Sequence, residues 1–196
     1  MRRTAWAWGC ALLAAGGSPA LADTQQMVST LCVSCHGEAG NSTVPIFPRL
    51  AGLQAEYIAK QLADFMAGKR KSDVMAPMVA QIKSADVAGL AAYYASQAPV
   101  RGTAADGARA AAGKTMYEDG NTTSGVPACA GCHQPAGAGN ERYPRLAGQH
   151  AVYTQAQMQQ FKAGTRNNDK ARVMRAVAER MTEDEMAAVA EYLAGL

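Results

Sequence analysis

Two short stretches of the chain repeat one pattern of residues that can bond covalently and bind a metal. CVSCHG, residues 32–37, and CAGCHQ, residues 129–134, both read Cys-x-x-Cys-His. At this spacing, both thiols can add to the vinyl groups of one haem while the adjacent His turns its ring onto the iron. The motifs predict two covalently bound c-type haems, with these residues as thioether links and iron ligands: Cys32, Cys35, His36, Cys129, Cys132 and His133.

A zinc site and a redox dithiol are the alternative uses of such cysteines. Zinc would need further Cys or His ligands, and the chain has only one His outside the motifs, His150. One site with four thiolate ligands from both motifs would leave both motif histidines without a role. A thioredoxin-type dithiol would sit in a βαβ pattern, and the sequence has no strand-like alternation. Haem attachment is the interpretation that uses every motif residue.

The first 22 residues have the features of a secretory signal peptide. Two arginines precede an apolar stretch, residues 5–15, and small residues end the segment at Ala20-Leu21-Ala22. The apolar stretch is shorter than the roughly 20 residues that span a bilayer. We therefore expect cleavage after Ala22 and a periplasmic protein. Cys10 leaves with the leader, so the four remaining cysteines all lie in the two motifs.

Charge and hydropathy exclude other classes of partner. The formal net charge of +3 falls to +1 when Arg2 and Arg3 leave with the leader, which is unlike a nucleic-acid binder with a dense basic face. No later apolar run is long enough to predict a transmembrane segment. The sequence leaves open whether the exported chain associates peripherally with a membrane.

The chain contains an internal repeat that covers most of its length. FPRLAGLQAEYIAKQLADFMAGKRKSD, residues 47–73, aligns without gaps to YPRLAGQHAVYTQAQMQQFKAGTRNND, residues 143–169, at an offset of 96. A fixed offset with this many identities indicates two copies of one structural unit. Identical pairs include Pro48 and Pro144, Arg49 and Arg145, Tyr57 and Tyr153, Gln61 and Gln157, and Arg70 and Arg166.

The repeat also selects a sixth ligand for each iron. A Met thioether is the common sixth ligand in electron carriers, and seven methionines follow a motif within their own half. After a three-residue insertion the offset becomes 99, and only Met75 and Met174 then superpose. Met78 is the rival, but its repeat partner is Val177, which cannot bind iron. The other four are interpreted as packing residues of helices: Met66, Met158, Met181 and Met186.

Apolar residues at helical spacing predict an all-α fold with two small domains. Residues 23–100 and 101–196 are the expected domains, and the stretch SQAPVRGTAADG, residues 96–107, is the expected linker. Ser84 or Asp86, and Thr182, are plausible N-caps of the last helix in each half. Only nine residues, 23–31, precede Cys32 in the expected mature chain, which leaves little chain for a first helix.

With these motifs, the "VM" ligand segments and the closing helices AAYYASQ and AEYLAGL, the sequence resembles the dihaem cytochromes c4, two-domain members of the class I cytochromes c. The resemblance covers residues 27–196. It implies two His/Met haems, domains related by a pseudo-two-fold axis and haem propionates that face each other. It also implies an electron carrier between a cytochrome bc complex and a terminal oxidase.

The resemblance suggests roles for further residues near each haem. In class I cytochromes a proline carbonyl accepts the hydrogen of the His ring, and Pro48 and Pro144 lie where this proline is expected. Arg49 and Arg145 could pair with haem propionates, and Tyr57 and Tyr153 could donate to a propionate or pack in the core. Two positions depart from symmetry. Leu53 stands opposite Gln149, which predicts a missing polar contact near the first haem, and His150 is expected at the surface or an interface.

The predicted function is single-electron transfer without substrate chemistry, so we do not expect an enzyme. One alternative is a cytochrome subunit of an exported dehydrogenase that acts on sulfide or an alcohol. The other is a dihaem peroxidase, which needs an iron with an open sixth position; a matched Met in both halves argues against it. The different surroundings of the two irons, such as Leu53 against Gln149, predict unequal reduction potentials.

Overall fold

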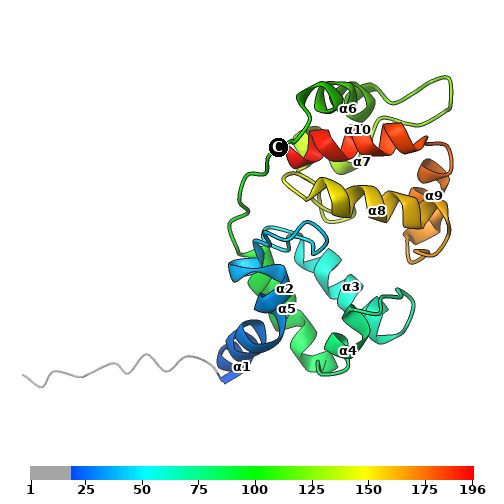
Figure 1. The fold of residues 1–196 in the computed structure, drawn as a ribbon. Coiled ribbons are helices and arrows are strands. Elements are labelled where there is room, and N and C mark those ends of the chain that lie inside the picture. Colours follow the sequence, from blue (N-terminus) through cyan, green and yellow to red (C-terminus); the bar gives the residue numbers. More distant parts are fainter. Residues whose placement is uncertain (1–18) are drawn as a thin grey trace, which may run out of the picture.

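The computed structural model describes residues 19–196, which form two helical halves in succession along the chain (Figure 1). The first half is coloured blue to green in Figure 1, and the second green to red. Residues 19–196 contain no strand, and a single antiparallel bridge joins Asn121 to Val126. The expected all-α fold is confirmed. The predicted leader lies mostly outside the described residues, which include only its last four, at the start of a helix.

The first half contains α1 (Pro19–Met27), α2 (Val33–His36), α3 (Ala55–Met66), α4 (Met75–Val79) and α5 (Val87–Ala95). A π-helical turn, Val28–Cys32, joins α1 to α2, so an almost continuous helix leads into the first Cys motif. Short 3-10 turns lie at Glu38–Gly40 and Ser84–Asp86. The short segment before Cys32 therefore does form a first helix, and it packs against α5.

The second half contains α6 (Gly107–Asp119), α7 (Ala130–His133), α8 (Ala151–Lys162), α9 (Val173–Ala178) and α10 (Glu183–Ala194). Short 3-10 turns lie at Pro135–Gly137 and Lys170–Arg172. The Asp106 carboxylate caps α6 by accepting from the backbone N–H of Arg109 at 2.9 Å. Thr182 caps α10 in a reciprocal pair with Glu185, as the sequence predicts.

Each half has its own apolar core. The first is built from residues such as Val28, Ile58 and Leu90, and the second from residues such as Tyr117, Met186 and Leu193. Three of the methionines interpreted as packing residues lie in the second core: Met158, Met181 and Met186. Met66 packs against the first core. Separate cores agree with two domains, although the exact boundary at residue 100 stays a prediction.

In each half, the first and last helices cross closely at a glycine. This glycine lies on the first helix in the second half and on the last helix in the first half. In the second half it is Gly113 on α6, where an added Cβ would lie 1.9 Å from the backbone oxygen of Ala188 on α10. In the first half it is Gly89 on α5, where an added Cβ would lie 2.6 Å from the Thr24 hydroxyl oxygen on α1. Gly89 and Ala188 are repeat partners at the offset of 99.

The linker is held at both of its ends. The side chain of Asn41 donates to the carbonyl of Ala98 at 3.1 Å and accepts from the N–H of Val100 at 3.0 Å. The carboxylate of Glu191 accepts from the N–H groups of Ala105 and Asp106 at 2.9 and 3.3 Å. The segment thus starts on the first half and ends on α10.

Candidate haem sites

The two motif histidines lie at equivalent places in the two halves. His36 ends α2 and His133 ends α7, and they are 9% and 7% exposed. The Nδ1 atom of His36 is 2.8 Å from the carbonyl oxygen of Pro48, and that of His133 is 3.0 Å from the carbonyl oxygen of Pro144. A carbonyl can only accept, so each Nδ1 carries the hydrogen.

These surroundings prepare both rings for metal binding. Burial lowers the pKa of His36 and of His133, and the proline carbonyl opposes this effect without cancelling it. Each imidazole is therefore neutral near pH 7, with its hydrogen on Nδ1 and its lone pair on Nε2. Among residues 19–196, no hydrogen bond engages either Nε2. A neutral imidazole oriented through the other nitrogen is the usual form of a metal-binding His.

The four motif cysteines are partly buried and none forms a disulfide. Burial raises the pKa of Cys32 and raises that of Cys129 to about 11, so both thiols stay protonated near pH 7. In residues 19–196, no three His, Cys, Asp or Glu side chains gather where they could hold a metal ion. The donor set fits covalent haem attachment better than a zinc centre.

The two matched methionines occupy similar positions. Met75 is the first residue of α4 and Met174 the second residue of α9, and each is partly buried against the core of its own half. Met78, one turn further along α4, is partly buried but is not among the residues that pack against the first core. The packing thus pairs Met75 with Met174, as the repeat does.

The two arginines expected near haem propionates have different environments. Arg49 donates from Nη1 to the carbonyl of Gly148 at 2.5 Å and from Nε to the carbonyl of Ser42 at 3.2 Å. The Nε of Arg145 is buried and has no hydrogen-bond partner among the described residues. A buried guanidinium N–H without an acceptor is costly. A haem carboxylate is the kind of acceptor that this group would suit.

A cross-domain polar cluster was not predicted from the sequence. Arg70 of the first half donates to the Tyr153 hydroxyl at 2.9 Å and to Gln157 Oε1 at 2.8 Å. Reciprocally, Arg166 of the second half donates to the Tyr57 hydroxyl at 3.1 Å. Each arginine also lies over the ring of its own half, Arg70 on Phe65 and Arg166 on Phe161, with distances of 4.7 and 4.4 Å to the ring centroids.

This cluster explains why the repeat keeps these residues. Contacts of residue i with j and of j with i are what a two-fold axis between the halves requires. Burial would raise the pKa of Tyr57, but the charges of Arg166 and Arg70 outweigh it and lower that pKa. The tyrosine hydroxyls, one on α3 and one on α8, therefore face guanidinium groups of the opposite half. Figure 1 shows these two helices on the facing sides of the two halves. The only sign of this cluster in the sequence was that its Arg, Tyr and Gln residues are identical in the two copies of the repeat.

The expected loss of a polar contact at the first site is wrong. Gln149 of the second half reaches across, where its Oε1 accepts from the N–H of Arg49 and its Nε2 donates to the carbonyl of Arg49, both at 3.0 Å. Gln54 makes the reverse contact, because its Oε1 accepts from the N–H of Arg145 at 2.8 Å. The repeat alignment did not reveal that the two glutamines make equivalent contacts, because Gln54 aligns with His150 rather than with Gln149.

His150 lies at the interface between the halves. Its Nε2 is 2.9 Å from the carbonyl oxygen of Ser42. Partial burial and the nearby charge of Arg49 lower its pKa, and the contact with the Ser42 carbonyl opposes them. The expectation of a surface or interface position agrees with this placement.

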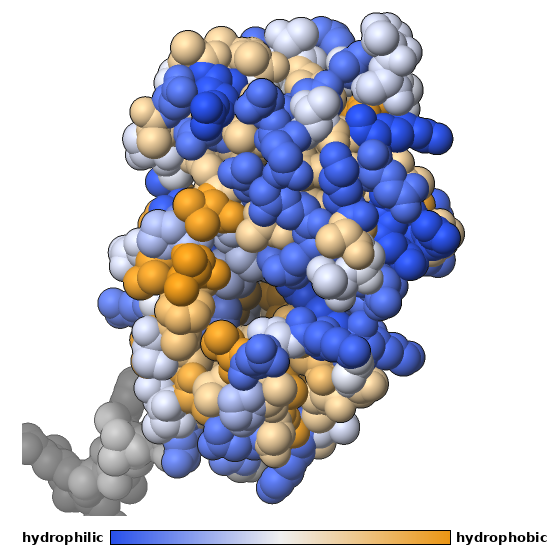
Figure 2. Space-filling view, turned by 45° about the vertical axis from the view of Figure 1, so that its right-hand side comes forward, coloured by the Kyte–Doolittle hydropathy of each residue, from blue (hydrophilic) through white to orange (hydrophobic). Residues whose placement is uncertain are grey.

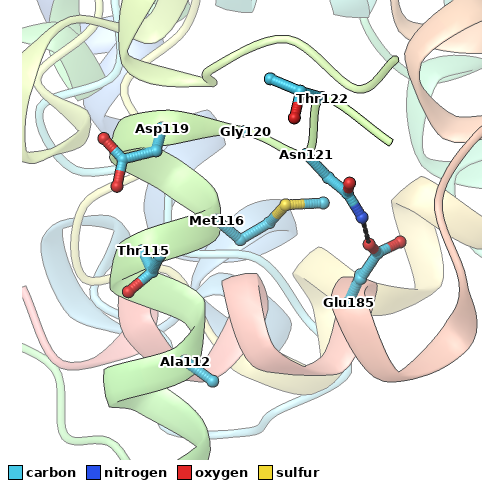
Figure 3. A pocket seen from close by; sticks show the side chains of 8 residues that line it. All are labelled: Ala112, Thr115, Met116, Asp119, Gly120, Asn121, Thr122 and Glu185. Atoms are coloured by element: carbon cyan, nitrogen blue, oxygen red, sulfur yellow. Dashed lines mark hydrogen bonds between the residues drawn. The ribbon is translucent and has the colours of Figure 1, made fainter. Parts of the chain in front are cut away.

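An open hollow of about 410 Å³ lies away from the motifs (Figure 3). It is enclosed by α6, the loop that follows α6, and the start of α10, and the Asn121 amide donates to Glu185 across it at 2.7 Å. Its lining contains no His or Cys, and its one sulfur, from Met116, belongs to the apolar core. The hollow is therefore a feature of the loop that follows α6 and not a haem site.

Two helical halves, each with a buried neutral His, two adjacent cysteines and a matched Met, define a dihaem c-type cytochrome. The cytochrome c family model matches residues 21–98 and again residues 110–196. The chain is 46% identical over 169 residues to a cytochrome c4 from Thiocapsa roseopersicina, which covers 85% of this chain and 87% of the relative.

It is also 40% identical over 167 residues to a thiosulfate dehydrogenase electron acceptor from Thiomonas intermedia (strain K12), covering 83% of this chain and 77% of that protein. Among solved structures, reduced recombinant cytochrome c4 from Pseudomonas stutzeri superposes with a TM-score of 0.85 at 38% identity, over 90% of this chain and 98% of that one. The chain belongs to the dihaem cytochrome c4 family. It carries two covalently bound c-type haems and is an electron carrier, not an enzyme.

Proposed function

We propose that His36 and Met75 are the axial ligands of the first iron, and that His133 and Met174 are those of the second. Cys32 with Cys35, and Cys129 with Cys132, form the thioether links. The observation that carries this proposal is the pair of equivalent His Nδ1 contacts with Pro48 and Pro144, which leave both Nε2 atoms for iron. When bound, each haem supplies a one-electron ferrous/ferric couple.

The surrounding residues have distinct tasks in this proposal. The proline carbonyls orient the ligand rings, and the protein environment sets the two potentials through burial and hydrogen bonds. Arg145 pairs with a propionate of the second haem, because its buried Nε has no protein acceptor in residues 19–196. Arg49, which two backbone carbonyls already engage, has a weaker case for the same role at the first haem. Tyr57 and Tyr153 hold the arginines at the junction of the domains.

We further propose that the chain is exported, cleaved after Ala22 and works in the periplasm as two domains, residues 23–100 and 101–196. There it passes single electrons from a cytochrome bc complex to a terminal oxidase. Exposed apolar side chains beside the sites suit brief docking: Ile46 is 63% exposed, and Val74 and Val173, which precede the proposed Met ligands, are 54% and 39% exposed. On the face shown in Figure 2, the largest apolar areas lie toward the left edge at mid-height. Small, weak interfaces are typical of redox encounters.

A second candidate function is to accept electrons from an exported dehydrogenase. The similarity to a thiosulfate dehydrogenase electron acceptor favours this alternative, with an inorganic sulfur compound as the substrate of the partner enzyme. No comparable observation favours the peroxidase alternative, and the repeat, which supplies a matched Met in both halves, argues against an open sixth position.

Mass spectrometry and a spectroscopic redox titration test these proposals together. Denatured protein should carry two haem masses on a chain that begins at Asp23, and the ferric protein should show the long-wavelength charge-transfer band of thioether ligation for both irons. Two separate one-electron waves are expected, since the two sites differ in their surroundings. Reduction rates with a bc complex and with a thiosulfate dehydrogenase distinguish the two functions. A chain with disulfides or zinc in place of haem would refute the ligand assignment.

A further inference from the structure

The peptide unit that contacts each ligand His is also contacted by a glutamine of the other domain. In the first half, this unit joins the carbonyl of Pro48 to the N–H of Arg49. Its carbonyl accepts from His36 Nδ1 at 2.8 Å, and its N–H donates to Gln149 Oε1 at 3.0 Å. A continuous hydrogen-bond chain thus runs from Gln149 in the second half to the ring of His36 in the first.

The second half contains the mirror arrangement. The carbonyl of Pro144 accepts from His133 Nδ1 at 3.0 Å, and the N–H of Arg145, in the same peptide unit, donates to Gln54 Oε1 at 2.8 Å. Gln54 belongs to the first half. The same chain of bonds therefore crosses the interface in both directions, although the two glutamines are not repeat partners.

The surroundings hold both glutamines in place. Gln149 is 9% exposed, and its Nε2 also donates to the carbonyl of Arg49. Its side chain is therefore hydrogen-bonded to both the N–H and the carbonyl of that residue. Gln54 is anchored by donating from Nε2 to the carbonyl of Ala138 at 3.2 Å. Gly139 leaves the space for it, since a Cβ there would lie 2.7 Å from Gln54 Nε2 and 2.3 Å from the Arg145 nitrogen.

We infer that Gln149 and Gln54 are positioning residues that tune the haem of the opposite domain. This inference rests on the proposed ligand roles of His36 and His133. A peptide N–H that donates polarises the carbonyl of the same peptide unit, which then accepts more strongly, by about 10–30% per bond. A stronger bond to Nδ1–H makes the imidazole a better electron donor to iron. Better donation stabilises the ferric form and lowers the potential.

As a consequence, each domain influences the reduction potential of the haem in the other domain. Loss of Gln149 should weaken the His36 bond and raise the potential of the first haem, while loss of Gln54 should do the same at the second. Roughly a threefold change in the reduction equilibrium is expected, or about 30 mV at 59 mV per tenfold for a one-electron couple. Separation of the domains would also disconnect both chains of hydrogen bonds, so the interface and the potentials are linked.

The test uses the full haem-loaded protein with nitrogen-15 in its histidines. The chain has three His in all, so the reduced, diamagnetic protein gives few ring signals, and those of His36 and His133 can be assigned through contacts with Pro48 and Pro144. Gln149→Met should move the Nδ1–H signal of His36 upfield and leave that of His133 unchanged. Gln54→Met should move the Nδ1–H signal of His133 upfield and leave that of His36 unchanged.

Asn168→Ala is the matched control. It is neutral and removes two other cross-domain hydrogen bonds, from Asn168 Nδ2 to Gln61 Oε1 at 3.0 Å and to Asp64 Oδ2 at 2.7 Å. Both His signals should stay in place in this variant. If the glutamine variants shift both signals equally, or shift neither, the inference is overturned. A wild-type protein without His/Met spectra would instead refute the ligand assignment itself, so the two failures are distinguishable.

Discussion

The two domains share their sites and their interface but differ in how their helices are packed. The core of the second domain contains eleven buried residues, led by the fully buried Tyr117 and Met186, whereas that of the first contains eight. The residues that recur in both halves are instead the prolines beside the motif histidines and the Arg, Tyr and Gln side chains of the interface. Geometry at the haem and at the junction is thus kept while the core that supports it varies.

Loss of the proposed sixth ligand should have the largest effect. Met75→Ala should open only the first iron, and Met174→Ala only the second. Each variant should lose half of the thioether charge-transfer band, bind carbon monoxide at one haem and lower one potential by on the order of 100 mV, because axial ligands span about 0.8 V in proteins. Optical spectra and a redox titration measure all three effects.

Met78→Ala is the control for that experiment. Both irons should remain six-coordinate in this variant, since Met78 pairs with Val177 in the repeat and does not pack against the first core. If Met78→Ala removes half of the band and Met75→Ala leaves it intact, the Met ligand of the first iron lies one turn further along α4 than the repeat predicts.

The difference between the cores predicts unequal sensitivity to truncation. Met186 is 0% exposed, whereas its repeat partner Val87 is only partly buried. Met186→Ala should lower the free energy of unfolding of the second domain by about 2–5 kcal/mol, which is typical of a buried Met→Ala change. Val87→Ala should lower that of the first domain by about 1 kcal/mol, from the loss of about 0.8 kcal/mol per buried methylene.

Urea unfolding followed by the circular dichroism of each haem would measure both values. Equal losses would show that the smaller core is as tightly packed as the larger one.

The helix crossings predict a smaller contrast between two glycine substitutions. In Gly113→Ala the new Cβ meets the backbone of Ala188 at 1.9 Å, so α6 and α10 must move apart, at about 1–3 kcal/mol. In Gly89→Ala it meets the hydroxyl end of the Thr24 side chain at 2.6 Å, and a gain of about 0.5–1 kcal/mol in helix propensity offsets the crowding. Thermal unfolding should place Gly89→Ala near wild type and Gly113→Ala well below it. Similar melting temperatures would contradict the backbone contact.

The smallest expected effect concerns pH. The pKa of His150 is lowered in the docked protein, mainly by partial burial and by the charge of Arg49. A proton therefore binds more readily once the ring is released to solvent, so stability is full above about pH 6.5, the ordinary histidine range, and falls as pH decreases below it. His150→Gln should flatten this slope slightly. The melting temperature measured between pH 5 and 8 would reveal it, and an unchanged slope would exclude His150 as its source.

Much of the site could be predicted because covalent haem chemistry confines Cys and His to one short pattern, and because the repeat allowed Met75 and Met174 to be compared. The helices and the Thr182 cap followed from local periodicity and capping rules. The cross-domain contacts could not be predicted in the same way. Gln149 and Gln54 occupy different positions in the repeat. Only the structure shows that each accepts a hydrogen bond from a backbone N–H of the other domain, at Arg49 and Arg145. Arg70 and Arg166 were visible as repeated residues, but their partners lie more than 80 positions away.

The linker that Asn41 and Glu191 hold at its two ends has a consequence for how strongly the domains need to attract each other. Because both domains are on one chain, their association is intramolecular, and a short tether gives each domain an effective local concentration in the millimolar range. The hydrogen bonds across the interface therefore need to supply less free energy than they would between two separate proteins. If the two domains separate, the tether keeps them close enough to return to contact without a diffusional search.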